Sequence, residues 1–314
     1  MGRHLAQRLV QVPLVLLVVS LTIFAVTRAT PGDPVQIMLG TQTSPEAMDA
    51  MRHEFNLDRS LPVQYGLWLL RVVQGDLGRS IRLNQPVTVL LAERLPISLE
   101  LATAAMLFAI AVAVPLGIAA ALWRNSWVDY LCTGYTVAGF AVPNFALALV
   151  LIYVFSVQLD WLPITGIGSS ENRGVWANVS PFILPAVALG TLQTAVFARL
   201  LRASLIDVLG QPYMRVAEAK GLLPTTVVGL HALKNALIPF VTMVAIQFGY
   251  MIGIQVTIEY IFAIPGMGSA VLNAVVNRDF PVVQGFTLVV AAFFLLTNIA
   301  ADLLYSVLDP RIRY

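Results

Sequence analysis

Long apolar runs without Asp, Glu, Lys or Arg dominate the chain and predict membrane-spanning helices. A helix needs about 20 consecutive, mostly apolar residues to cross a bilayer. Seven runs are candidates: residues 9–27, 101–123, 130–159, 174–198, 235–258, 260–277 and 280–301. The sixth contains the breaker cluster Ile264-Pro265-Gly266-Met267-Gly268, which predicts a loop or re-entrant connection. The pattern therefore predicts an all-α protein with six spans.

The first run also has a feature of signal peptides, because Arg3 and Arg8 precede it. However, the run is long, and its end at Ala25-Val26-Thr27-Arg28 lacks a small-residue cleavage pattern. We interpret residues 1–28 as a cytoplasmic end and an uncleaved first helix.

The basic residues predict the sidedness of the chain. With the N-terminus inside, ten of them fall on the cytoplasmic side and two in short outer loops. The cytoplasmic set is Arg3, Arg8, Arg124, Arg199, Arg202, Arg215, Lys220, Lys234, Arg311 and Arg313, and the outer set is Arg173 and Arg278. Both termini are therefore expected in the cytoplasm.

Residues 29–96 are expected to form a folded external region rather than a linker. The stretch 28–100 balances seven Arg against eight acidic residues and is too long for its charges to orient the chain. Turn signals recur at Pro31-Gly32-Asp33-Pro34, Leu61-Pro62 and Gly75-Asp76-Leu77-Gly78. We expect short helices and turns here, followed by a core at 97–314 with five more spans and a cytoplasmic loop at 199–234.

Composition and missing motifs exclude several functions. Hydrophobic residues make up 58% of the chain and charged residues 11%, with a mean hydropathy of +0.80, which excludes a water-soluble enzyme. A net charge of +2 provides no basic face for nucleic acid. No Gly-Lys dipeptide occurs, so the phosphate-binding loop of many ATPases is missing. Three His and one Cys, Cys132, predict neither a metal site nor a catalytic constellation.

The predicted spans carry no charge at their middle. Glu259 and Asp302 lie at span ends, where we interpret them as interfacial residues. This disfavours an ion-coupled carrier, although that alternative stays open because sodium carriers can coordinate ions through backbone carbonyls.

The cytoplasmic segment 199–234 contains residues that typically begin and end helices, which a plain polar loop lacks. A short helix is predicted over Tyr213–Lys220, with Gly221 as its C-terminal cap. Pro224 suits the first turn of a second helix that runs through His231 and Asn235 into the fifth span. This second helix is amphipathic, which fits either a groove on a partner or the lipid surface. We interpret His231 as a surface or interface residue.

At this loop the sequence resembles the membrane permeases of bacterial ATP-binding-cassette (ABC) importers. It is most similar to the first permease subunit of the dipeptide, oligopeptide, glutathione and nickel group, over nearly the whole chain. The motifs that carry the resemblance are PGDP at 31–34, LDRSLPVQY at 57–65, GDLGRSI at 75–81, YMRVAEAKGL at 213–222, HALKNALIP at 231–239, IEYIFAIPGMG at 258–268, RDFPVVQG at 278–285 and DPRIRY at 309–314.

The resemblance implies a loop that couples ATP hydrolysis to transport. The family motif, Glu-Ala-Ala followed after three residues by Gly, aligns with Arg215, Ala217 and Gly221, so Glu218 is not its acidic residue. The implied coupling residues are Tyr213, Arg215, Ala217, Ala219, Lys220, Gly221, Pro224, His231, Lys234 and Asn235.

On the outer side, glycines that permit tight turns and flanking charges suggest a functional interpretation of the loop between spans five and six, as part of an outer gate or the seat of a binding protein. The candidate residues are Glu259, Pro265, Gly266, Gly268, Arg278 and Asp279. Tight turns with ordinary interfacial charges are an equally good interpretation. The in-span polar residues Gln247, Gln255 and Asn298 fit either a pathway lining or interhelical hydrogen bonds.

The resemblance also implies partners, fold and location. The implied fold is the type I ABC importer permease fold in a bacterial inner membrane. The partners would be a second permease, two cytoplasmic ATPases that hold the ATP and magnesium, an extracytoplasmic binding protein and membrane lipid, with no cofactor on this chain. WRNSWVD at 123–129 and FSVQLDWLP at 155–163 are more similar to the glutathione branch, whereas nickel is disfavoured by the lack of His and the single Cys in the spans.

Overall fold

The computed structural model describes residues 2–29, 58–165 and 175–308, together with positions 46, 48 and 53. Within these residues the regular structure is helical, apart from one isolated bridge between Arg79 and Pro86. The predicted turn at 31–34 and the motif at 309–314 lie outside the described residues.

Five helices are long and apolar enough to cross a membrane, and a bent pair of helices makes a possible sixth span. The five are Gln11–Ala29, Val87–Leu122, Trp176–Leu209, Pro224–Ile254 and Phe280–Ser306. The predicted all-α membrane fold is therefore confirmed, while the cytoplasmic placement of both termini stays a prediction.

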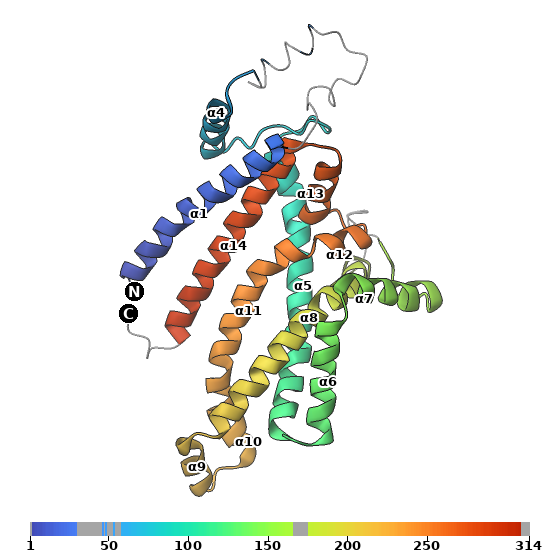
Figure 1. Cartoon of the computed structure of the whole chain (residues 1–314). Coiled ribbons are helices and arrows are strands. Elements are labelled where there is room, and N and C mark those ends of the chain that lie inside the picture. The colour runs from blue at the N-terminus through green and yellow to red at the C-terminus, as the bar shows by residue number, and fades with distance from the viewer. Residues whose placement is uncertain are drawn as a thin grey trace. The chain divides into compact units, whose positions relative to one another are not determined.

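The chain divides into two compact units, of which the first consists chiefly of Leu99–Ile264 and Leu296–Tyr314. Its central helix is α8 (Val175–Leu209), which packs against α6 (Trp127–Ala141), α7 (Asn144–Leu151) and α11 (Lys234–Ile254) (Figure 1). The shorter elements of this unit are the π-helix η1 (Ile152–Gln158), α9 (Pro212–Ala219), α10 (Pro224–Thr226), the π-helix η2 (Val227–Leu233) and α12 (Val256–Ile261). Cys132 is buried on α6, in agreement with its interpretation as a core residue.

The second unit consists of Gly2–Ser98 and Pro265–Leu295. It contains α1 (Gly2–Ala29), α4 (Leu61–Val73), α13 (Met267–Val276) and the first parts of α5 (Val87–Leu122) and α14 (Phe280–Leu308). Hydrogen bonds join Ser20 to Tyr65 at 2.8 Å and Gln284 to Thr27 at 2.7 Å. The apolar core of this unit surrounds Val87 and Phe286, which are fully buried.

The run 130–159 is not the single continuous helix that the sequence analysis expected. The helices on either side of Val142 and Pro143 meet at 103°. Val142 is extended, with φ −89° and ψ 118°, because the ring of a following proline disfavours the helical conformation. Pro143 also lacks the N–H that would continue the helical hydrogen bonds.

Two other spans extend past the charge-free runs that predicted them. Helix α5 begins at Val87 rather than near residue 101, and α8 continues to Leu209 through Arg199 and Arg202. The predicted loop 199–234 therefore starts as a helix. The breaker cluster interrupts the helix as expected, since α12 ends at Ile261 and a separate short helix, α13, begins at Met267 within the cluster.

Candidate functional site

The site that the sequence predicts between the fourth and fifth spans is a helix–glycine–helix unit, residues 212–235. Helix α9 ends at Ala219, and the N–H of Gly221 donates to the carbonyl of Glu218 at 2.9 Å. Gly221 has a φ of +74°, a left-handed conformation that glycine adopts without steric cost. The predicted C-terminal cap is therefore present.

One face of α9 is buried against the rest of the unit. Met214 and Ala217, three residues apart and thus on one face, are 1% and 8% exposed. Helix α9 contacts η2, where Val227 and Ala232 are buried. The motif position Ala217 thus lies in the interior of the loop, where a large side chain would separate α9 from η2.

Side chains from both helices of the unit meet at its edge. The amide nitrogen of Asn235 donates to the Tyr213 hydroxyl at 3.4 Å and to the His231 carbonyl at 2.7 Å. The contact between Asn235 and Tyr213 thereby brings together two predicted coupling residues from the two helices, whereas that with His231 lies within one helix. This edge ties the position of α9 to the start of α11.

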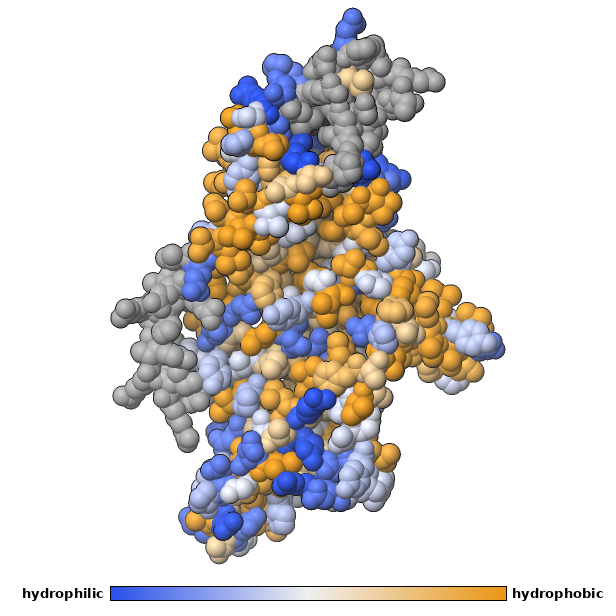
Figure 2. Space-filling view, viewed as in Figure 1, coloured by the Kyte–Doolittle hydropathy of each residue, from blue (hydrophilic) through white to orange (hydrophobic). Residues whose placement is uncertain are grey.

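The other face of the unit is exposed and mixes apolar with charged side chains. In Figure 2, polar residues gather with a few apolar ones at the end of the molecule that carries α9 and α10. The exposed apolar side chains are Tyr213, Val216, Leu222, Leu223 and Leu230, and the exposed charged ones are Arg215, Glu218, Lys220 and Lys234. Ala219 and Pro224 are exposed as well. An exposed apolar cluster with a charged rim is typical of a protein-binding surface.

The second helix of the unit continues without a break into the helix predicted as the fifth span. Residues Pro224–Ile254 form one span, in which η2 is a π-helical stretch between α10 and α11. The π-helix η2 thus contacts both α9 and α11.

Among the outer candidates, Asp279 is the centre of a hydrogen-bond cluster. Its carboxylate accepts from the Ser80 hydroxyl and from the N–H groups of Ile81 and Arg82, the last two at 3.0 and 3.3 Å. Asp279 and Ser80 are both buried, and Arg278, directly before Asp279 in its motif, has a φ of 57°. The sequence analysis named Asp279 but missed Ser80, although both lie in motifs that carry the family resemblance.

The outer glycines do not make the tight turns that were expected. Gly266 is extended, with φ −93° and ψ −172°, and Gly268 lies inside α13; the left-handed residue is Ala263, with a φ of 50°. The segment is fixed instead by hydrogen bonds from Arg94 to the Pro265 carbonyl at 3.1 Å and from the Met267 N–H to Ser98 at 2.7 Å.

Glu259 is buried rather than interfacial. Its side chain lies on α12, which packs against α7 and α8, and the residue is fully shielded from solvent. The interpretation of Glu259 as an interfacial charge was therefore wrong, because the bend at Pro143 brings α7 over α12. Gln247, in contrast, makes an interhelical hydrogen bond, donating from α11 to Gln193 on α8 at 2.7 Å.

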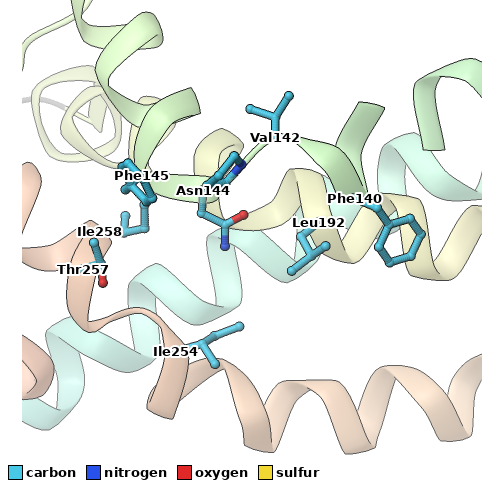
Figure 3. A pocket seen from close by; sticks show the side chains of 9 residues that line it. Phe140, Val142, Asn144, Phe145, Leu192, Ile254, Thr257 and Ile258 are labelled. Carbon is cyan, nitrogen blue, oxygen red and sulfur yellow. The ribbon is translucent and has the colours of Figure 1, made fainter. Parts of the chain in front are cut away.

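A cleft of about 270 Å³ lies at the bend between α6 and α7. It is lined by Phe140, Val142, Pro143, Asn144, Phe145, Leu192, Ile254, Thr257 and Ile258, none of which is charged. Figure 3 shows the Asn144 carboxamide pointing toward the space between Leu192 and Ile254. The sequence analysis missed this cleft. The sign of it in the sequence was Pro143-Asn144, a possible helix break in the middle of the run 130–159.

Replacing Asp279 with asparagine is expected to loosen the turn at 80–82. The neutral amide is a weaker acceptor, and hydrogen bonds to a charged group are worth about 1.5–3 kcal/mol each. Tryptic cleavage after Arg82 in the purified protein should then be roughly tenfold faster. Asp76→Asn is the matched control, because Asp76 is exposed and accepts one hydrogen bond, from Gly78 at 2.9 Å. Equal cleavage of the two variants would contradict a structural role for Asp279.

These features define a class of protein: a helical, multi-pass membrane protein with a structured loop between two of its spans, one face of which is exposed and partly apolar. The family model described as "Binding-protein-dependent transport system inner membrane component" matches residues 113–314, and the corresponding N-terminal model matches residues 1–102. The chain therefore belongs to this family, the inner membrane permeases of ABC transporters. It is a transport subunit, and the resemblance inferred from the motifs is confirmed.

Relatives align with the chain from end to end. It is 38% identical to the glutathione transport system permease protein GsiC of Escherichia coli K12 and to that of Salmonella typhimurium LT2, over 314 residues that cover all of each chain. It is 37% identical, over the same coverage, to a probable peptide ABC transporter permease protein of Sinorhizobium fredii. A crystal structure of an amino acid ABC transporter with histidines shares the fold, with a TM-score of 0.51 and 16% identity over 72% of this chain and 95% of that one.

Proposed function

We propose that this chain forms part of the pathway of an ABC importer that brings peptides, including glutathione, across the cytoplasmic membrane. The energy would come from ATP hydrolysis on two cytoplasmic ATPase subunits, with a second, similar permease completing the pathway. An extracytoplasmic binding protein would deliver the substrate. The cargo is inferred from the named functions of the full-length relatives.

The observation that carries the proposal is the helix–glycine–helix unit. Its inner face is anchored through Met214 and Ala217, while its outer face exposes Leu222 and Leu223 next to charged residues. A docked ATPase would thus hold a stiff element rather than a flexible loop. Closure of the ATPases on ATP would displace α9, and the continuous span from Pro224 would transmit the displacement into the membrane.

Uptake measurements test the proposed cargo. Labelled dipeptide, a longer peptide and glutathione are offered to cells with and without this gene. We expect uptake of one of these classes to be lost with the gene, which would identify the cargo. Unchanged uptake of all three in cells that lack other importers for them would contradict the peptide proposal.

Leu223→Asp is expected to abolish docking of the ATPases. Leu223 is 69% exposed, so the change leaves the fold intact but places a charge in the centre of the apolar surface. Loss of a central interface residue weakens binding by about 2 kcal/mol or more, roughly thirtyfold. Co-purification of the tagged chain with the ATPases measures the effect, and Leu223→Met, which keeps an apolar side chain, is the matched control. Normal co-purification of the Asp variant would place the docking surface elsewhere.

A further inference from the structure

A two-pronged polar contact in the first unit joins the beginning of α6 to the end of α8. The Nε and Nη2 atoms of Arg202 each lie 2.7 Å from a different carboxylate oxygen of Asp129. The Asp129 side chain is 5% exposed and that of Arg202 is 31% exposed. The N–H of Asn125 also donates to the carboxylate, at 3.0 Å.

The pair lies close in the chain to the helix–glycine–helix unit, through the end of α8. Arg202 is two turns before the end of α8, which α9 follows after Gly210 and Gln211. Asp129 is in the first turn of α6, next to the turn that joins α5 to α6.

A second arginine of α8 contacts the other end of α6. The guanidinium carbon of Arg199 lies 4.4 Å from the centre of the Phe140 ring, an arrangement that favours a cation–π interaction. Phe140 lines the cleft at the α6–α7 bend. Two arginines one turn apart on α8 thus hold α6 at its first turn and at the cleft.

We propose that Asp129 and Arg202 are positioning residues for transport. They fasten α6 to α8, so that a displacement of α9 by the ATPases moves α6 and the cleft at its far end together with α8. The inference rests on the proposed function, because it assumes that α9 receives the ATPase movement.

The chemistry of the pair fits transmission better than simple stabilisation. A bidentate Arg–carboxylate pair adds a specific geometry to the contact between the two helices. Helices held by packing alone can slide past one another by small shear motions. As a source of stability such a pair is a poor choice, because apolar residues of similar size often support the fold equally well. A purely structural role therefore predicts that an apolar replacement works normally, and a positioning role predicts that it does not.

The decisive variant is the double substitution Asp129→Leu with Arg202→Met in the full transporter with its partner subunits and binding protein in proteoliposomes. ATP hydrolysis and substrate uptake are measured on the same preparation. We expect normal assembly and ATP hydrolysis, with the amount of substrate carried per ATP reduced about tenfold, which lies within the usual range of couplings between sites. Arg124→Met is the matched control, since it removes an exposed arginine from the neighbouring turn and should leave coupling unchanged.

Two further measurements keep the test decisive. Arg202→Lys keeps the charge but loses the two-pronged contact, and it should give an intermediate coupling ratio. Spin labels at positions 141 and 220 report movement directly: ATP should shift both labels in the wild-type complex and only the label at 220 in the double variant.

The outcomes separate the inference from the proposed function. A double variant that transports with the wild-type ratio, or whose label at 141 still moves with ATP, overturns the inference and leaves the proposed function standing. A wild-type chain that fails to assemble with ATPases overturns the proposed function, and the inference then falls with it.

Discussion

Gly190→Leu is expected to prevent accumulation of the folded protein in the membrane. Gly190 lies on α8 at a close approach of that helix to α5. A Cβ atom there would stand 2.6 Å from the carbonyl oxygen of Ala105 and 2.8 Å from the ring of Phe108. The first contact is with backbone, so the helices have to separate. Overpacking of this kind costs about 1–3 kcal/mol, and loss of close helix contact inside a bilayer adds to it.

The measurement is thermal unfolding of the purified protein, together with its abundance in membranes. Gly190→Ala should already lower the stability, because its one added carbon makes the same clash. Gly134→Ala on α6 is the matched control: nothing lies within 4 Å of a Cβ there, and alanine is the better helix former by about 0.5–1 kcal/mol. Similar unfolding temperatures for the Gly190 and Gly134 alanine variants would refute the close crossing of α5 and α8.

The spans were predictable from the sequence because their length is set by the bilayer. The ends of the spans were not predictable in this way, because a charge-free run stops at the first charged residue, whereas a helix can continue past it. Helix α8 passes Arg199 and Arg202, whose charges are met by Phe140 and by Asp129. These partners are far away in the sequence, so the run itself gives no sign that the helix continues.

The bend at Pro143 shows a second limit of the pattern. Prolines at 181 and 185 lie inside α8, and Pro239 lies inside α11, without ending either helix. Neighbouring helices in a membrane protein can satisfy the groups that a proline frees, so a proline in an apolar run does not by itself mark a break. Pro143 differs from these prolines because the helix that follows it, α7, packs on α8 and α12. The cleft and the burial of Glu259 depend on the same packing, which the sequence pattern does not show.

The helix–glycine–helix unit was predictable because the residues that begin and end its helices act locally. A glycine cap and a proline in a first helical turn act on the backbone within a few residues, which is why the boundary between α9 and α10 fell where it was expected. The cluster around Asp279 needs Ser80, almost two hundred positions earlier. Such a pair has no local signature, and it becomes visible only when the chain is folded.

Gly221→Val is expected to reduce substrate uptake roughly tenfold while the chain still folds and inserts. The left-handed conformation at φ +74° costs an L-residue about 1–2 kcal/mol, and a β-branched side chain suffers most. No atom lies within 4 Å of a Cβ at this position, so the effect comes from the backbone and not from a clash inside the chain. The strain would turn α9 away from η2 and misalign the surface that is proposed to meet the ATPases.

Two variants separate backbone strain from a general effect of mutation in the loop. Gly221→Asn should retain most uptake, since asparagine tolerates the left-handed region. Gly229→Ala adds a side chain where nothing lies within 4 Å and where φ is not positive, so uptake should stay normal. ATP hydrolysis and uptake by the assembled transporter are compared for all three variants. If valine and asparagine at position 221 impair uptake equally, side-chain bulk against the ATPase is the cause; if neither does, the glycine cap has no part in coupling.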